Sequence, residues 1–165
     1  LDVCYTFDKK ELGKLLPARM MHSHKGSYGK VLMITGSPGL AGACISFCLL
    51  LPIQFGAGLV QIYTASENRL ALQELLPEAI ISCYDSYDDS QLSHLLDWAD
   101  VVCIGCGLGM GQISEKILKN VLKNVSCPCV IDADGLNLLN GKIELLNQCR
   151  APCDFNSTYE RNVKN

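Results

Sequence analysis

Short apolar runs alternate with amphipathic segments along most of this chain. Unbroken apolar runs, typical of strands buried on both faces of a parallel sheet, predict strands at residues 30–35, 59–64, 79–83, 101–104 and 129–131. Helical spacing of apolar residues predicts a short helix that ends near Trp98 and longer helices at 43–55, 68–76 and 114–123. A first helix is expected from the capping-box pair Asp8 and Glu11 to just before Pro17.

The alternation of strands and helices indicates the fold class. It predicts an α/β fold with a doubly wound, mostly parallel sheet and helices on both faces, joined by right-handed crossovers. Ligands of such sheets bind beyond the carboxyl ends of the strands. Three glycine-containing bends follow predicted strands, and we expect them to line up along one rim and face a common cleft: 36–42, 105–111 and 132–135. Bare backbone and helix-start amides there favour a phosphorylated or otherwise anionic ligand.

Two carboxylates, Asp132 and Asp134, follow the last predicted strand, and Asn137 lies in the next apolar run. Carboxylates at a strand end are costly to desolvate and usually persist because they bind something. The simpler alternative is a strand-to-helix turn with Asp134 as the N-cap. Sequence alone leaves both interpretations open.

Familiar nucleotide and metal motifs are incomplete in this chain. The glycine spacing of the first loop does not match the dinucleotide fingerprint, and Met110 stands where the second loop would need glycine or alanine. An ordinary nicotinamide dehydrogenase is therefore a weak interpretation. His22 and His24 lack an evident third ligand, and the Cys103 and Cys106 pair lacks a matching second pair, which argues against a metal site.

Length, composition and charge narrow the class of protein further. A chain of 165 residues suits one domain, and a net charge of −3 without a basic run gives no indication of a nucleic-acid partner. No apolar run reaches the ~18 residues of a membrane span, so we expect no membrane partner. The ten cysteines do not resemble a disulfide framework, which favours a reducing cytoplasm. The acidic segment 85–89 is most simply a solvated loop.

Several segments together resemble the NAD(P)H-hydrate dehydratase family of the ribokinase-like superfamily. In chain order they are HKGSYGKVLMITGS (24–37), LAGA (40–43), GAGLVQIYT (56–64), LLPEAII (75–81), IGCGLG (104–109) and VIDADGLNLL (130–139). The resemblance implies the amino-terminal portion of a ribokinase-like fold. It divides the chain into a linker with an N-terminal helix (1–22), a partial dehydratase domain (23–152) and an aberrant tail (153–165).

The resemblance also implies an activity, a lyase reaction. The family uses ADP or ATP to dehydrate hydrated NADH or NADPH: the nucleotide phosphorylates the hydroxyl group of the hydrate, and elimination restores the nicotinamide ring. The amino-terminal stretch is similar to the linker after an epimerase domain in bifunctional members, so a fused upstream epimerase domain is expected. A homo-oligomer is expected for the full-length protein.

The residues of the site follow from the same resemblance. One wall of the hydrate site would be Gly42 and Ala43, and a second wall would be Gly107 with its neighbours Gly105 and Gly109. The polar groups of the ligand, or a magnesium ion near its phosphates, would be held by Asp132, Asp134 and Asn137. No catalytic residue is assigned within this chain.

The chain departs from the family after Pro152. The family continues with a Thr-Pro-His-x-x-Glu segment, a lysine-glycine nucleotide loop and a Gly-Ser-Gly-Asp segment with the catalytic base, and the printed sequence has none of them. A one-base shift offers an explanation, because one codon choice for residues 153–165, read one base later, gives VILTPHMREMSR. We therefore interpret residues 153–165 as a frameshift product and expect this chain, without the nucleotide half and the base, to be inactive.

Two other functions are compatible with the fold class. A ribokinase-like kinase for a thiazole or pyrimidine alcohol would accumulate a phosphorylated product without elimination, and the HKGSYGK segment argues against it. A non-catalytic nucleotide-binding module would bind a dinucleotide without any repair activity in the full-length protein.

Overall fold

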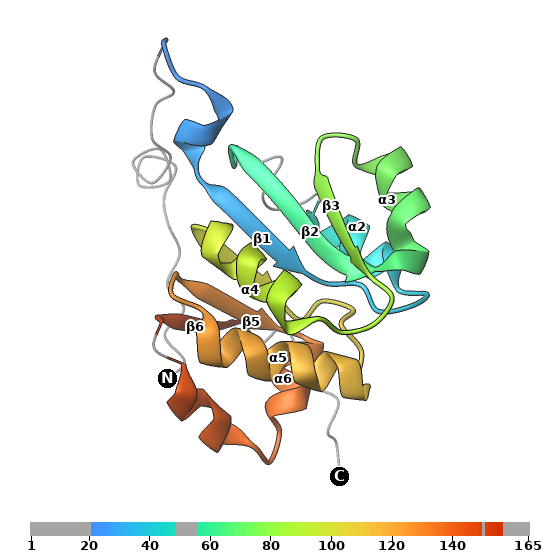
Figure 1. The fold of residues 1–165 in the computed structure, drawn as a ribbon, viewed down its shortest axis with the longest axis vertical. Coiled ribbons are helices and arrows are strands. Elements are labelled where there is room, and N and C mark those ends of the chain that lie inside the picture. The colour runs from blue at the N-terminus through green and yellow to red at the C-terminus, as the bar shows by residue number, and fades with distance from the viewer. Residues whose placement is uncertain (1–20, 49–55, 150, 157–165) are drawn as a thin grey trace, which may run out of the picture.

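A single parallel sheet organises the chain. The computed structural model describes residues 21–48, 56–149 and 151–156. Six strands form the sheet in the order β3-β2-β1-β4-β5-β6, and every neighbouring pair is parallel (Figure 1). The strands are β1 (Lys30–Ile34), β2 (Leu59–Ala65), β3 (Ile80–Tyr84), β4 (Val101–Ile104), β5 (Cys129–Asp132) and β6 (Cys153–Asn156). The predicted doubly wound, parallel α/β fold is therefore confirmed.

Helices cover both faces of the sheet because side chains alternate along each buried strand. Met33 faces one side and packs in a core with Cys44 of α2 (Ala41–Cys48) and Leu72 of α3 (Arg69–Leu75). Leu32 and Ile34 face the other side. Their core contains side chains of α4 (Asp89–Trp98), α5 (Gln112–Asn124) and α6 (Asp134–Leu139). Since both faces are buried, the strands need the unbroken apolar runs by which the sequence predicts them.

Shorter elements complete the described chain. They are the 3₁₀ helices η1 (Lys25–Tyr28), η3 (Ser66–Asn68) and η4 (Ile143–Gln148). The predicted N-terminal helix before Pro17 lies outside the described residues, as does the end of the predicted helix 43–55. None of the helices in the described ranges is long and apolar enough to cross a membrane.

Strand β6 lies where the chain turns polar, and it pairs with β5 from Cys129 opposite Cys153 to Asp132 opposite Asn156. It is an edge strand, and Phe155 is half exposed on it. An edge strand needs one ladder partner rather than two apolar faces, which explains a strand in a segment with so little apolar pattern.

The order of the strands changes direction between β1 and β4. From β1 the chain proceeds to β2 and β3 on one side of the sheet, whereas β4, β5 and β6 follow one another on the other side. The loops after β1 and β4 therefore diverge at the centre of the sheet. Such a switch point opens a crevice at the carboxyl ends of the strands, where ligands of α/β proteins bind.

Candidate functional site

The three predicted bends meet at the carboxyl rim of the sheet. The backbone N–H of Ser37, in the first bend, donates to the carbonyl of Gly107 in the second at 2.7 Å. The backbone N–H of Gly109 donates to Oδ2 of Asp134, in the third, at 2.8 Å. The prediction that these bends share one rim is confirmed, and they are in direct contact.

Two glycines permit this contact by having no side chain. Gly105 has a φ of +131°, and a Cβ atom on it would lie 1.9 Å from the carbonyl oxygen of Asp132. Gly107 has a φ of +62°, and its Cβ would lie 2.6 Å from that of Ala43. Both distances are far below van der Waals contact, so the β4 loop can reach α2 and the β5 turn only with glycine at these positions. Gly42 is exposed, with open space beside it.

The polar side chains after β5 have unequal surroundings. Asp132 is buried, and its Oδ1 accepts a hydrogen bond from the backbone N–H of Ala133 at 2.7 Å. Asp134 is half-buried, and its Oδ1 accepts a long hydrogen bond of 3.4 Å from the side-chain amide of the exposed Asn137. The N-cap of α6 is Ala133, without a side-chain cap, so the alternative of Asp134 as N-cap is wrong. The Asp134 carboxylate holds the β4 loop instead.

Cys106 adds a thiol to the second bend. Its Sγ donates to Oδ2 of Asp132 at 3.7 Å. Burial, followed by the negative charge of Asp132, raises the pKa of this thiol to about 12. The group is therefore a neutral donor to the carboxylate and not a nucleophilic thiolate.

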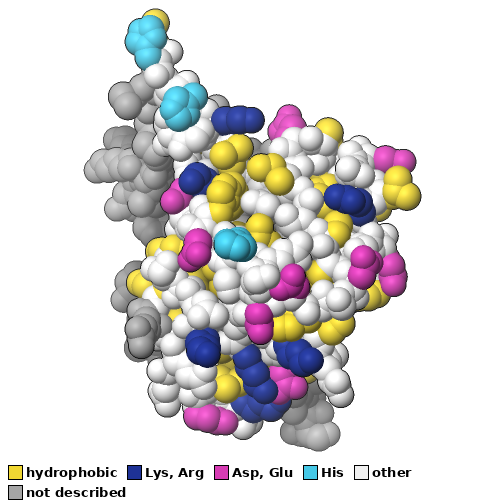
Figure 2. Space-filling view, in the orientation of Figure 1, with side chains coloured by type: hydrophobic (Ala, Val, Ile, Leu, Met, Phe, Trp, Pro, Cys, Tyr) yellow, Lys and Arg dark blue, Asp and Glu magenta, His cyan; other side chains and the backbone are white. Residues whose placement is uncertain are grey.

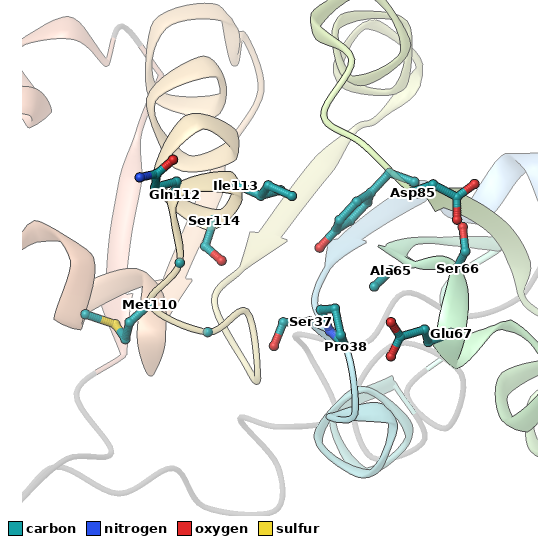
Figure 3. A pocket seen from close by; sticks show the side chains of 13 residues that line it. Ser37, Pro38, Ala65, Ser66, Glu67, Asp85, Met110, Gln112, Ile113 and Ser114 are labelled. Atoms are coloured by element: carbon teal, nitrogen blue, oxygen red, sulfur yellow. The ribbon is translucent and has the colours of Figure 1, made fainter.

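A cavity of about 410 Å³ opens beside the bends at the switch point between β1 and β4. Its size falls within the range of small-molecule sites. It is lined by Ser37, Pro38, Ala65, Ser66, Glu67, Tyr84, Asp85 and the residues 109–114 (Figure 3). Of the site residues named from the sequence, only Gly109 lines it. Ala43, Gly105, Gly107, Asp132 and Asp134 lie along the contacts between the bends, whereas Gly42 and Asn137 are exposed.

The cavity contains functional groups that sequence reasoning missed. Tyr84 is only 6% exposed, its ring packs against that of Tyr63 at 4.9 Å, and burial raises its pKa. Tyr84 lines the cavity at the end of β3. Glu67 and Asp85 contribute carboxylates, and the lining contains no Lys, Arg or His. Glu67 lies two residues after the end of β2 and Asp85 directly follows β3, and this position beyond the strand ends is the signal that could have identified both carboxylates.

A second hollow, of about 670 Å³, lies between α4, α5 and η4. Basic side chains gather over α5 on this face (Figure 2), and Lys116, Lys119 and Lys123 line the hollow. It lies along helix flanks, away from the strand ends. Asn120 already donates to Asp89 there at 2.6 Å. The simplest interpretation is a solvated charged face.

The described residues contain no group of three His, Cys, Asp or Glu side chains that could hold a metal ion. His22 and His24 are both exposed. Any cation at the rim would therefore need ligand atoms from a bound substrate in addition to one or two carboxylates, which is how Mg²⁺ is commonly bound.

The fold and the rim define a ribokinase-like α/β protein. A ribokinase-like superfamily protein of Enterococcus faecalis has the same fold, with a TM-score of 0.73 and 28% identity over 86% of this chain and 51% of that one. The family model of the NAD(P)H-hydrate dehydratases matches residues 31–153. The chain belongs to this family.

Individual relatives agree with that assignment. The bifunctional NAD(P)H-hydrate repair enzyme Nnr of Escherichia coli is 41% identical over 133 residues, which are 81% of this chain and 25% of the relative. The ADP/ATP-dependent NAD(P)H-hydrate dehydratase of Bacillus subtilis, co-crystallised with ATP and Mg²⁺, has a TM-score of 0.60 and 28% identity. This match covers 73% of the chain and 43% of the solved structure. The chain thus spans a fraction of each relative.

Proposed function

We propose that the protein to which this chain belongs is a lyase that restores NADH or NADPH from their hydrated forms, with ADP or ATP as the second substrate. The observation that carries the proposal is the glycine-packed contact between Gly105, Gly107 and the bends on either side. It occurs in a chain of this family and at the rim where α/β sheets bind ligands.

The hydrate would lie against the exposed face of Gly42, Ala43 and Gly107. The closeness of Gly107 to Ala43 supports this, because the two positions form one continuous surface with little side chain on it. Gly105 and Gly109 would hold the β4 loop in place. Gly105 packs closely against Asp132, and the backbone N–H of Gly109 donates to Asp134. The backbone amides of such a loop can bind the ligand directly.

Magnesium and the phosphates would lie near Asp132, Asp134 and Asn137. Carboxylate and amide oxygens are the hard ligands that Mg²⁺ prefers, and Asp134 is half-buried at the rim with one oxygen in only a long hydrogen bond. Bound Mg²⁺ would neutralise charge on the phosphates. The donor set fits a cation that is shared between protein and nucleotide.

We propose that this chain alone is inactive, because the printed sequence lacks the nucleotide loop and the catalytic base of the family. Residues 1–22, 23–152 and 153–165 would be the linker, a partial domain and a frameshifted tail. Sequencing the gene across codons 150–170 tests the tail, since codons incompatible with the reading VILTPHMREMSR would exclude the frameshift.

We also propose a fused domain, a cellular compartment and an oligomeric state for the full-length protein. A fused upstream epimerase domain is supported by the bifunctional relative of Escherichia coli. The cysteines whose side chains the structure describes are free thiols, in agreement with a reducing cytoplasm. We further propose a homo-oligomer for the full-length protein.

The test is an assay of the full-length protein, expressed from the gene with its reading frame restored. Hydrated NADH and ATP are supplied with Mg²⁺, and the return of the dihydronicotinamide absorbance is followed. Gly107→Ala should abolish turnover, whereas Gly39→Ala, with open space around its Cβ position, should retain it. A phosphorylated product without elimination would indicate the kinase, and dinucleotide binding without any turnover would indicate the binding module.

A further inference from the structure

We propose that Cys149 and Cys153 form a reversible oxidation site, at which glutathione disulfide converts the two thiols into an intramolecular disulfide that fastens the edge strand β6. Cys153 is the first residue of β6, so the site lies at the amino ends of the parallel strands, away from the rim. The proposal is therefore independent of the dehydratase activity. Because Cys153 also begins the segment that we interpret as a frameshift product, the site belongs to the chain as printed.

The first argument is the distance between the two thiols. The Sγ atoms of Cys149 and Cys153 lie 2.8 Å apart, and either thiol can donate to the other. By comparison, the Sγ atom of Cys106 lies 3.7 Å from the carboxylate oxygen to which it donates. A further approach of about 0.8 Å would bring the two sulfur atoms to the length of a disulfide bond. Small rotations of the two side chains can supply that approach.

The second argument is that these two thiols can be reached, whereas a third thiol beside them cannot. Cys149 and Cys153 are both half-buried. The Cys149 thiol also lies 3.6 Å from the carbonyl oxygen of Ala151, which keeps it in the turn before β6. Cys129 is opposite Cys153 in the ladder, but it is only 1% exposed, and burial raises the pKa of its thiol. A buried, protonated thiol is inert, so the reaction selects Cys149 and Cys153.

The pair with C-x-x-C spacing does not compete for the oxidant. Cys103 packs against the core on the α2 side of the sheet, whereas the thiol of Cys106 donates to Asp132 at the rim. Burial and the charge of Asp132 hold the Cys106 thiol in its protonated form. Since a thiolate is required for exchange, this spacing alone does not make a reactive pair.

The chemistry is two successive thiol–disulfide exchanges. The thiolate of Cys149 attacks one sulfur atom of glutathione disulfide, so that a mixed disulfide forms and one glutathione thiolate leaves. Burial raises the pKa of Cys153 to about 12, so this thiol attacks second, when the mixed disulfide already lies beside it. Cys153 loses its proton, bonds to the sulfur of Cys149 and releases the second glutathione thiolate. Two protein thiols are oxidised, one glutathione disulfide is reduced, and the two protons pass through solvent to the glutathione thiolates.

The disulfide would connect β6 to a part of the chain that is already packed. Strand β6 lies at the edge of the sheet beside β5 (Figure 1). Cys149 directly follows η4, and η4 packs on α5. A cross-link from Cys149 to Cys153 limits how far the first residue of β6 can move when the strand opens. Because accessible disulfides are more easily reduced than buried structural ones, the link should be reversible.

The experiment is the oxidation of the folded chain as printed with an excess of glutathione disulfide, followed by alkylation of the remaining thiols and digestion with trypsin. Cleavage after Lys142, Arg150 and Arg161 gives the peptides 143–150 and 151–161, each with a single cysteine. A disulfide between Cys149 and Cys153 joins these two peptides, so mass spectrometry identifies it uniquely.

The joined peptides should exceed every other intramolecular cysteine pair by at least about tenfold in the folded chain, and dithiothreitol should separate them. Cys149→Ser and Cys153→Val should abolish the joined peptides, and the latter carries the residue of the shifted reading. The matched control Cys83→Ser, at a half-buried cysteine of β3 on the opposite edge of the sheet, should retain them. In urea the excess should fall below about threefold, because cysteines of other nearby pairs become accessible.

Three results would overturn the assignment of the site. They are a dominant link between Cys129 and Cys153, mixed disulfides with glutathione but no joined peptides, and the same distribution of links in urea as in the folded chain. Each would show that the geometry of the folded chain does not select Cys149 and Cys153.

Hydrogen exchange tests the effect on the strand. Oxidation should slow the exchange of the β6 backbone amides by at least about tenfold, because the cross-link restricts the opened state. The amides of β3, the strand at the other edge, should be unaffected. If the β6 amides exchange at the same rate in the oxidised and the reduced chain, the disulfide does not fasten the strand and the proposal is wrong.

Discussion

Replacement of Gly105 by alanine tests whether the bends depend on the bare backbone of the β4 loop. The added Cβ would lie 1.9 Å from the carbonyl oxygen of Asp132 and 2.8 Å from the backbone nitrogen of Gly135. Both neighbours are backbone atoms and cannot rotate away. The φ of +131° is a second obstacle, because alanine rarely adopts it.

The loss of folding stability expected for Gly105→Ala has two contributions, one from the steric overlap and one from the positive φ. Overpacking against a rigid neighbour costs about 1–3 kcal/mol, and a residue with a side chain at unfavourable positive φ costs about 1–3 kcal/mol. We therefore expect Gly105→Ala to lose about 2–6 kcal/mol, a large part of the about 5–15 kcal/mol that keeps a domain folded.

Two control variants separate the causes. Gly39 has a φ of +79° with nothing near its Cβ position, so Gly39→Ala carries the backbone cost alone. Gly111 has a φ of −79° and open space, so Gly111→Ala should change stability by less than about 1 kcal/mol, in either direction. The expected order of destabilisation is Gly105→Ala, then Gly39→Ala, then Gly111→Ala.

Urea denaturation, followed by fluorescence and circular dichroism, measures these differences. Trp98 is the only tryptophan of the chain and reports on α4, where Lys30 lies 5.7 Å from the centre of its ring. If Gly105→Ala is no less stable than Gly39→Ala, the close approach to Asp132 is not what fixes the loop, and the argument for a glycine-packed rim is refuted.

Three further changes test other parts of the structure. Tyr63→Phe removes a buried hydroxyl that has no partner among the described residues, so it should leave stability unchanged or raise it by up to about 1 kcal/mol in the same urea titration. Asp134→Ala removes the acceptor of the Gly109 amide and should cost about 1–2 kcal/mol, against no measurable loss for the exposed Asp97→Ala. Burial raises the pKa of Cys106 from 9.0 to about 12, so the unfolded chain loses this proton first and stability should fall as the pH rises from 9 toward 12. Cys106→Ala should make this decrease in stability with pH less steep. An identical slope would contradict the assignment of the pH dependence to the Cys106 thiol.

The strands could be predicted from the sequence because burial on both faces leaves a strong local signal. β4 has the predicted boundaries, and β3 begins one residue later than expected. The predicted helix 68–76 is α3 (Arg69–Leu75), and Asn68 is instead the last residue of the 3₁₀ helix η3. Asn68 turns its amide back to the carbonyls of Gly36 and Ser37, at 2.9 and 3.1 Å, and this long-range contact has no local pattern.

The cavity could not be predicted in the same way. Its walls come from the ends of four strands and the start of α5, which are brought together only by the strand order. Asp85 follows β3 in a segment that resembles a solvated loop, and it is indeed exposed. The burial of Tyr84 depends on its packing against Tyr63 of the neighbouring strand, so neither residue alone indicates a site.

The tight packing of the bends also determines where a ligand can lie. A contact in which one Cβ atom cannot fit has no space for a substrate, so the contact between Gly105 and Asp132 is structural and a ligand must bind beside it. Two places are open at this rim: the exposed surface at Gly42 and the cavity that begins at Gly109. Both adjoin the β4 loop, whose backbone position is fixed by the close packing of Gly105 and Gly107.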